Sequence, residues 1–443
     1  MAVIMFGIAP TGGHLASAIQ VARNLAERGY DIVFISPDLF TRDYVAEYGF
    51  RFYQLPSPKP PPPGRLGQMV PTLGRFQKAR RGLRVAKRML TDGELIKGIF
   101  DAIGPDLIVF ENTLGAYALS AMPFGKPVVL ISVHASVHKR RLVPPIDARF
   151  LPRDTFFGRL RIELSWMRHL LPRKVRVLIA GSLDDIMARI ARCNGLDPDK
   201  VLDRKRYINA APRLPEFILC PEEFDFPSES ADCTWCGPSI VENRPPSGFD
   251  WSWRNESRPL IYCAVGGVAP RWRRDQASSF LRRVAQAFSK EPGYDVLIAT
   301  GPATFEGNFP GHIRTVAHGP QMEALRRASL FISHGGTNSI KESIWCGVPM
   351  LICPFFGDQF GNAARVQYHS LGERANRKRI TPEQILALSK KVLQDDRYRR
   401  KLREFQSIFV EAEKQNNAAD HIERILMESR GAAGCVRYRQ GGA

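Results

Sequence analysis

The chain has 443 residues, which is too many for one ordinary hydrophobic core and predicts two domains. Its 44% hydrophobic and 24% charged residues fit a globular protein, and no apolar run is long enough to predict a transmembrane helix. The net charge of +19 is uneven, because residues 1–215 hold 33 Lys and Arg against 18 Asp and Glu. We therefore expect the N-terminal half to meet an anionic partner or surface.

The cysteines and the N-terminus bear on the compartment. Eight cysteines are scattered along the chain, and only Cys233 and Cys236 have the spacing of metal ligands. No second pair complements them, so a zinc site is not expected. The N-terminus lacks the basic start of a signal peptide. These features predict a reduced, cytoplasmic protein.

Short apolar strands alternate with helical patterns along the chain. The first predicted strands are VIMFGIAP (3–10), DIVFISP (31–37), RFYQLP (51–56), PDLIVFEN (105–112) and PVVLISVH (127–134). The pattern restarts with RPLIYCAVGGVAP (258–270), DVLIAT (295–300), IRTVAHG (313–319), SLFISHGG (329–336) and PMLICPF (349–355). Such alternation is typical of parallel βαβ units, so we expect two doubly wound, Rossmann-like α/β domains.

The composition also predicts domain boundaries. We assign an N-terminal domain to 1–218, a Pro- and Ser-rich linker to 219–258 and a second domain to 259–415. Residues 416–443 are assigned to a C-terminal helix and tail, which we expect to pack back on the N-terminal domain. Ligands of doubly wound sheets bind beyond the carboxyl ends of the strands, so two facing domains predict an interdomain cleft.

An anion site is predicted where the strand SLFIS gives way to a helix. His334, Gly335 and Gly336 follow the strand, and Asn338 and Ser339 begin the helix. Glycines let the backbone approach a ligand, and the free N–H groups and the helix dipole favour an anion. Because the P-loop spacing and its lysine are absent, we interpret this segment as a diphosphate cradle.

Two acidic positions follow the cradle. Ser339 and Glu342 have the spacing of a helix capping box, but Glu342 could equally accept two ribose hydroxyls. Asp358 and Gln359 follow the next predicted strand, and an Asp beside a Gln suits a polyol such as a sugar.

At this point the stretch HGGTNSIKESIWCGVPMLICPFFGDQFGNAARV (334–366) resembles the donor-binding signature of the family 1 nucleotide-sugar glycosyltransferases, which have the GT-B fold and include bacterial UDP- and macrolide glycosyltransferases. The resemblance implies an N-terminal acceptor-binding domain and a C-terminal donor-binding domain. It implies that His334 and Gly336 contact the diphosphate beside Gly335, Asn338 and Ser339. Glu342 would bind the ribose, and Asp358 with Gln359 would bind the donor sugar.

The base-binding loop departs from the family pattern. Relatives usually have Trp-x-Pro-Gln, whereas this chain has His318-Gly319-Pro320-Gln321. Gln321 can still pair with a pyrimidine edge, but His318 covers the base with less aromatic area, which leaves the choice between uridine and thymidine open. An earlier loop, often Gly-Ser in relatives, is Gly266-Gly267, so Gly267 would offer only its backbone N–H to phosphate.

The expected catalytic base lies in the first domain. His14 follows the first strand at the start of a helix, where a histidine can also serve as a simple polar cap. An acceptor hydroxyl needs a base, and imidazole suits that role near neutrality. The equivalent His of the family is the general base. The resemblance also implies an orienting carboxylate at Glu111, where relatives commonly have Asp; Asn112 could share that contact.

Two basic stretches stand out in the first domain. Residues 75–90 (RFQKARRGLRVAKRML) form a predicted amphipathic helix, and residues 156–176 mix aromatics, Leu and Arg. Three interpretations remain: helices packed on their own domain with a solvated basic face, docking on the anionic inner face of a membrane to reach a lipophilic acceptor, or attraction of an acidic acceptor. No motif indicates binding to nucleic acid.

We therefore predict an inverting hexosyltransferase that needs neither metal nor cofactor. It would move a hexose from a UDP- or dTDP-sugar to a hydroxyl of a small, lipophilic acceptor and form a β-glycoside. Alternatives with the same donor pocket are a GT-B sugar-nucleotide epimerase, a transferase acting on a membrane glycolipid, and a silent sugar-nucleotide-binding protein. An epimerase would convert the sugar nucleotide without an acceptor.

Overall fold

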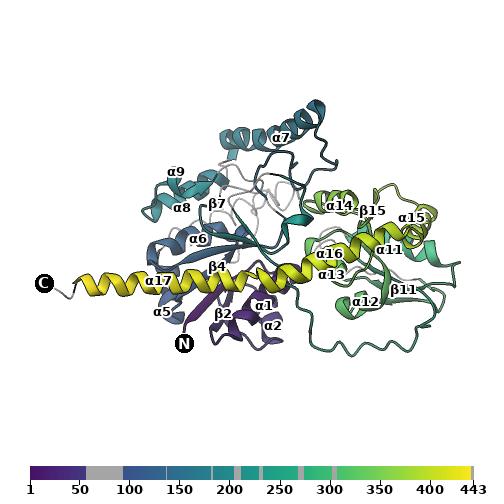
Figure 1. The fold of residues 1–443 in the computed structure, drawn as a ribbon, viewed down its shortest axis with the longest axis horizontal. Coiled ribbons are helices and arrows are strands. Elements are labelled where there is room, and N and C mark those ends of the chain that lie inside the picture. Colours follow the sequence, from purple (N-terminus) through teal and green to yellow (C-terminus); the bar gives the residue numbers. More distant parts are fainter. Residues whose placement is uncertain are drawn as a thin grey trace, which may run out of the picture.

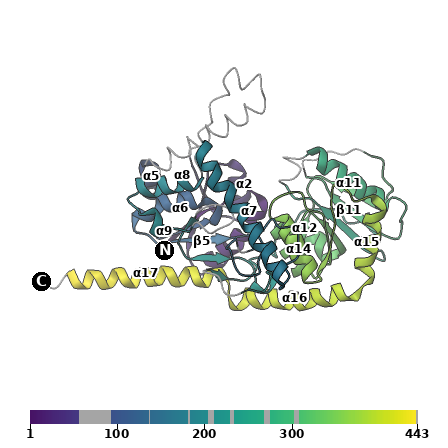
Figure 2. The same cartoon turned by 90° about the horizontal axis from the view of Figure 1, so that it is seen from above.

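The computed structural model describes residues 1–55, 93–135, 137–180, 183–203, 211–228, 233–267, 274–301 and 307–440. The basic stretch at 75–90 lies outside the described residues. The chain forms two lobes, each built on a parallel sheet flanked by helices (Figures 1 and 2). The predicted α/β architecture is confirmed.

Seven parallel strands form the first sheet. In spatial order they are β3 (Arg51–Gln54), β2 (Asp31–Ser36), β1 (Val3–Gly7), β4 (Leu107–Glu111), β5 (Val128–Ser132), β8 (Glu216–Ile218) and β9 (Thr234–Trp235). β4 and β5 are buried along their whole length, which is typical of strands covered on both faces. β9 lies within the segment assigned to the linker, so the chain leaves the first sheet only after Trp235.

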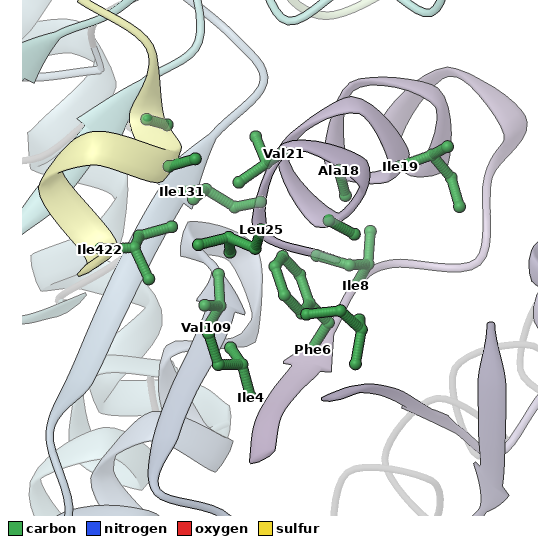
Figure 3. Packing of buried hydrophobic residues seen from close by; sticks show 14 of the residues in the cluster. Ile4, Phe6, Ile8, Ala18, Ile19, Val21, Leu25, Val109, Ile131 and Ile422 are labelled. Carbon is green, nitrogen blue, oxygen red and sulfur yellow. The ribbon is translucent and has the colours of Figure 1, made fainter. Parts of the chain in front are cut away.

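Helices enclose this sheet and bury its core. They are α1 (Gly12–Ala26), α2 (Leu39–Ala46), α5 (Gly93–Ile103), α6 (Gly115–Ala121), α7 (Phe156–Ala180), α8 (Leu183–Cys193) and α9 (Pro198–Val201). In Figure 3, Ala18, Val21 and Leu25 of α1 face this core, and Leu25 lies toward Phe6 of β1. These apolar positions recur every three or four residues, which gives α1 one buried face.

Six parallel strands form the second sheet. Their order is β12 (Ile313–Val316), β11 (Asp295–Ala299), β10 (Leu260–Ala264), β13 (Ala328–Ser333), β14 (Met350–Ile352) and β15 (Gly372–Arg374). The helices are α11 (Arg274–Phe288), α12 (Gln321–Arg327), α13 (Thr337–Trp345), α14 (Gln359–Tyr368), α15 (Pro382–Gln394) and α16 (Asp396–Gln415).

Each sheet has a point where its strand order reverses. β1 lies between β2 and β4, and β10 lies between β11 and β13. The loops on the two sides of such a point diverge and leave a crevice for ligands. His14 and Glu111 lie at the first of these points, and Gly266 and His334 lie at the second.

The last helix returns to the first lobe. α16 packs against α13, whereas α17 (Ala418–Gln440) packs along α1 and contributes Ile422 and Leu426 to the first core (Figures 1 and 3). The chain thus passes between the lobes twice, near Trp235 and near Asn416.

The two passages are bonded to each other. Gly237 N–H donates to the Asn416 carbonyl at 2.8 Å, and the Asn416 amide donates to the Trp235 carbonyl at 2.6 Å. Ser239 N–H donates to the Glu413 carboxylate at 2.7 Å. Within the described ranges, no helix is both long enough and apolar enough to cross a membrane.

Candidate active site

His14 and Glu111 form a close pair at the carboxyl edge of the first sheet. α1 starts at Gly12, which places His14 in its first turn, and Glu111 is the last residue of β4. His14 Nδ1 lies 2.7 Å from Glu111 Oε1. The Glu111 side chain is fully buried, whereas that of His14 is 24% exposed. A carboxylate at Nδ1 favours the tautomer in which Nδ1 carries the hydrogen, so Nε2 is free to accept a proton.

The Glu111 carboxylate is held in its ionised form. Burial alone would raise its pKa, but the interactions with His14 and His134 and a hydrogen bond from Ala9 N–H outweigh burial and lower the pKa. The Ala9 N–H donates to Oε2 at 2.9 Å, and Thr113 Oγ1 donates to Oε1 at 3.0 Å. Asn112 does not share the contact with His14. Its amide donates to Ser132 Oγ at 2.9 Å and to Glu216 Oε1 at 3.1 Å.

The predicted anion cradle forms at the second reversal point. β13 ends at Ser333 and α13 begins at Thr337, with Gly336 as its N-cap residue. Among the described side chains none caps this helix, so its first N–H groups are available to a ligand. Gly335 has a φ of 85°, a conformation that favours glycine.

The ring of His334 packs between two glycines. A Cβ added to Gly336 would lie 2.6 Å from His334 Nε2, and one added to Gly266 would lie 2.8 Å from the same ring. Any larger residue at either position would therefore displace the imidazole. Burial lowers the pKa of His334 to about 4, so the ring is neutral near pH 7. Gly267 follows in the same loop and is exposed.

Asn338 joins the cradle to the first lobe. Its amide donates to the Gly13 carbonyl, and its oxygen accepts from Ser17 Oγ at 2.7 Å. The buried Lys341 ammonium donates to Ser17 Oγ at 2.9 Å, to the Leu219 carbonyl at 2.9 Å and to the Pro238 carbonyl at 2.7 Å. The backbone beside His14 is thus fixed by residues of α13.

Glu342 is not part of a capping box. Gly336 is the N-cap, so Ser339 is the third residue of the helix rather than its cap. The Glu342 carboxylate is buried and accepts hydrogen bonds from the Arg244 guanidinium and the Gln321 amide. The capping-box alternative was wrong because the helix begins earlier than that pattern requires.

His318 and Gln321 of the predicted base-binding loop differ in exposure and in their contacts. His318 is exposed in the loop that follows β12, whereas Gln321 opens α12 and reaches Glu342. The Gln321 amide also lies 3.4 Å from Ser339 Oγ. The structure therefore gathers Gln321, Ser339 and Glu342 in one place, while His318 lies at its margin.

Asp358 and Gln359 lie at the start of α14. Asp358 Oδ2 accepts from Asn362 at 3.0 Å and from Thr337 Oγ1 at 3.3 Å, which anchors it beside the cradle. The Gln359 oxygen accepts from the backbone N–H groups of Phe355 and Phe356 at 2.8 and 3.2 Å, so this oxygen shapes its own loop.

His134 is a candidate site residue that the sequence analysis missed. It follows β5, the strand next to β4, and its Nδ1 lies 3.4 Å from Asp358 Oδ2 of the other lobe. Its ring meets that of His14 edge-on, with centroids 5.0 Å apart. The available signal was its place directly after a strand end in PVVLISVH.

His134 and Asp358 have complementary charges. Burial opposes the imidazolium, but the Asp358 carboxylate and the charge of Glu111 outweigh burial and raise the pKa of His134. Burial also opposes the Asp358 carboxylate, and its contact with His134 outweighs that effect and lowers the pKa of Asp358.

One described cluster has the geometry to hold a metal ion. It consists of His14, Glu111 and His134, whose ligand atoms lie within 4.8 Å of one another.

Arg244 is a second residue that sequence reasoning missed. It comes from the predicted linker, where arginines are ordinarily solvated, and pairs with Glu342 instead. Only the folding of the linker over α12 and α13 brings the two together, so the local sequence held no signal for it.

Comparison with known proteins bears on the family and the fold. The model of the family described as UDP-glucoronosyl and UDP-glucosyl transferase matches residues 274–423. The oleandomycin glycosyltransferase of Streptomyces antibioticus is 24% identical over 96% of this chain and 90% of its own length. The crystal structure of the glycotransferase of kitacinnamycin has a TM-score of 0.69 at 19% identity, covering 96% of this chain and 98% of that one. The spinosyn rhamnosyltransferase SpnG complexed with thymidine diphosphate has a TM-score of 0.66 at 15% identity, covering 96% and 100%.

Two α/β domains with parallel sheets and the likeness to these solved structures define a GT-B fold. Residues 274–423 match that family model and nearly the whole chain is similar to the oleandomycin glycosyltransferase, which together support a family 1 nucleotide-sugar-dependent hexosyltransferase. The resemblance seen in residues 334–366 is thereby confirmed.

Proposed function

We propose that the enzyme is an inverting transferase that moves a hexose from a UDP- or dTDP-sugar to a hydroxyl of a small, lipophilic acceptor. The observation that carries this proposal is the His14–Glu111 pair, whose side chains are 2.7 Å apart. The His134 ring contacts His14 on one side and Asp358 of the other lobe on the other. A base of the acceptor lobe and a sugar-binding carboxylate of the donor lobe are thus neighbours.

The proposed reaction begins with the acceptor hydroxyl. His14 Nε2 takes its proton while the oxygen bonds to the anomeric carbon of the donor. The bond from that carbon to the phosphate oxygen breaks, and its electron pair leaves with the nucleoside diphosphate. Attack opposite the leaving group turns an α-linked donor into a β-glycoside. Glu111 holds the Nδ1–H tautomer and stabilises the imidazolium that forms.

We assign the leaving diphosphate to the cradle. The N–H groups of Gly336 and Gly267 and of the start of α13 are its donors, with Gly335 and Ser339 beside them. The neutral His334 ring, which is hydrogen-bonded to the Ala264 backbone, would contact the diphosphate from the side of the two glycines. The helix dipole and these donors would stabilise the departing charge without a metal. Glu342 would bind the ribose and Gln321 the pyrimidine edge, with His318 over the base.

His134 is proposed as a positioning residue. As an imidazolium it holds the Asp358 carboxylate toward the place where donor and acceptor meet, and Asp358 with Gln359 would bind the hydroxyls of the sugar. This contact also links the two lobes at the reacting centre. The cytoplasmic location expected from the sequence stays a prediction.

The proposed class of acceptor and the proposed base of the donor nucleotide are inferred from similar enzymes. One similar enzyme is named for oleandomycin, and SpnG was solved with thymidine diphosphate. A natural-product aglycone and either pyrimidine therefore fit the proposal. A donor screen tests it: thermal shift with UDP, dTDP and their sugars, followed by mass spectrometry of products from an aglycone panel.

The expected result is a raised melting temperature with one pyrimidine nucleotide and a product heavier by one hexose, formed equally well in EDTA. Loss of product in His14→Ala, with the nucleotide shift retained, supports the assigned base. If no pyrimidine nucleotide stabilises the protein, the proposed donor is wrong. Conversion of the sugar nucleotide without acceptor would identify an epimerase instead.

A further inference from the structure

The helix α7 has two apolar faces rather than one. It is the uppermost helix in Figure 1, and its side chains are described from Phe156 to Arg168. Ile162 and Trp166 form the inner face and are 2% and 1% exposed. The Trp166 indole N–H donates to the Val143 carbonyl at 2.8 Å. The helix is therefore already anchored to its own domain.

The outer face of α7, defined by Phe156, Phe157, Leu160, Leu164 and Met167, is exposed. These side chains are 75%, 79%, 44%, 53% and 57% exposed. Spacings of three and four residues place most of them along one stripe. Leu160 and Leu164 are each two residues from the buried Ile162, which is about 200° around the helix, so they point away from the inner face. Of the nine large hydrophobic side chains that are exposed in the described part of the chain, five lie here. An exposed apolar face of this kind indicates a partner.

A cavity rich in arginine adjoins the start of this face. It has a volume of about 510 Å³, and four arginines line it: Arg149, Arg153, Arg161 and Arg374. Phe157 of the outer face lines it too, and none of its described lining residues is acidic. Arg149 stacks over Phe360 at 4.0 Å and Arg161 over Phe150 at 4.1 Å, which leaves guanidinium N–H groups to face an anion.

We propose that the outer face of α7 and the arginine cavity dock on an anionic phospholipid bilayer. Lipid headgroups supply phosphate for the arginines, and Phe156, Phe157 and the stripe behind them enter the boundary between headgroups and acyl chains. The charge of the lobe agrees, since residues 1–215 hold 15 more basic than acidic residues. This inference goes beyond the proposed transfer reaction and does not depend on it.

The test is co-sedimentation of the full chain with vesicles of phosphatidylcholine alone or with 30 mol% phosphatidylglycerol. We expect binding to the anionic vesicles, weakened by salt, and little binding to the neutral ones. Phe157→Ser with Leu164→Gln should weaken binding at least tenfold. Arg153→Gln with Arg161→Gln should weaken it by about fivefold for each arginine removed. Met427→Gln, on exposed α17, is the matched control and should bind as the parent does.

Each alternative occupant has its own outcome, and melting temperatures confirm that the variants are folded. Failure of the parent chain to bind anionic vesicles overturns the proposal. A dimer that the Phe157/Leu164 variant abolishes, without vesicle binding, would assign the face to a second copy of the chain. Loss of transfer to a water-soluble acceptor in that variant, again without vesicle binding, would assign it to acceptor recognition. Because vesicle binding is measured without catalysis, failure of the proposed function leaves this result intact.

Discussion

Replacing His134 by glutamine removes the imidazolium that faces Asp358 while keeping a polar side chain of similar reach. The two groups are 3.4 Å apart, and their side chains are 15% and 23% exposed. Fully exposed ion pairs contribute at most about 1 kcal/mol, and hydrogen bonds to charged groups about 1.5–3 kcal/mol. For this partly buried pair we take about 1–2 kcal/mol, which corresponds to about a 5- to 30-fold rise in the KM of the donor sugar.

The pH dependence separates this role from a merely structural one. The pKa of His134 is raised in the folded protein, so the contact with Asp358 is present below that pKa and is lost as the pH rises through it. Donor KM of the parent enzyme should therefore rise as the pH rises through this raised pKa. In His134→Gln, donor KM should be high at every pH.

Initial rates at varied donor concentration, from pH 6 to 9, provide the assay. The affinity for the free nucleoside diphosphate, which we assign to the cradle and Glu342 rather than to Asp358, should be unchanged. His138→Gln is the matched control, because His138 lies in the same loop but pairs with Glu216 at 3.1 Å. A donor KM that falls in His134→Gln would refute the reasoning, since it would mean that His134 sequesters Asp358 from the sugar.

The other predictions concern the base, its partner, the cradle and the contact between the lobes. His14→Ala should lower kcat by about 10²- to 10⁴-fold with donor binding retained, measured by steady-state kinetics and nucleotide titration. Glu111→Gln should lower kcat by a similar factor, because a glutamine amide can donate to Nδ1 and favour the tautomer that cannot accept the proton; unchanged kcat would exclude an orienting role. Gly336→Ala should weaken nucleoside diphosphate binding at least about tenfold in calorimetry, since its Cβ would lie 2.6 Å from His334, whereas Gly98→Ala, whose Cβ meets no described atom within 4 Å, should not. Lys341→Met should destabilise the fold by about 1–3 kcal/mol in urea, because two buried carbonyls lose their donor. Burial lowers the pKa of Lys341 in the folded protein to about 8, so above that pH the unfolded chain binds more protons at this residue than the folded protein does. The free energy of unfolding of the parent should therefore rise relative to that of the variant between about pH 8 and pH 10.

The sequence predicted those parts of the site that follow from local pattern. Glu111, the last residue of β4, was predicted only through the family resemblance. His14 and His334 each follow an apolar strand, and in parallel sheets all strands end on the same edge. That geometry placed them correctly before any tertiary contact was known. The glycines of the cradle were predicted because they follow such a strand and let the backbone approach an anion at the start of a helix.

The missed residues depend on contacts that local pattern does not encode. His134 became a candidate only when β5 was seen beside β4 and the second lobe brought Asp358 to 3.4 Å. Arg244 reaches Glu342 across 98 positions in sequence. The same limit applies to α7, where periodicity predicts an amphipathic helix but cannot say which face the domain covers. All three features, the contacts of His134 and Arg244 and the buried face of α7, depend on packing between residues far apart in the sequence. The pattern of a single sequence does not indicate such packing.

The bonded passages at Trp235 and Asn416 also restrict how the enzyme can open. Two separate crossings would let one lobe twist or slide on the other, but crossings tied together by three hydrogen bonds act as a single pivot. The lobes would then open by a hinge rotation about this point. Contacts close to it, such as that between Lys341 and the Pro238 carbonyl, would be kept. Displacement would grow with distance from that point. A tag or truncation that loosens α17 from α1 would remove the packing that follows directly on Asn416. We therefore expect it to disturb the alignment of the catalytic groups as well as the chain terminus.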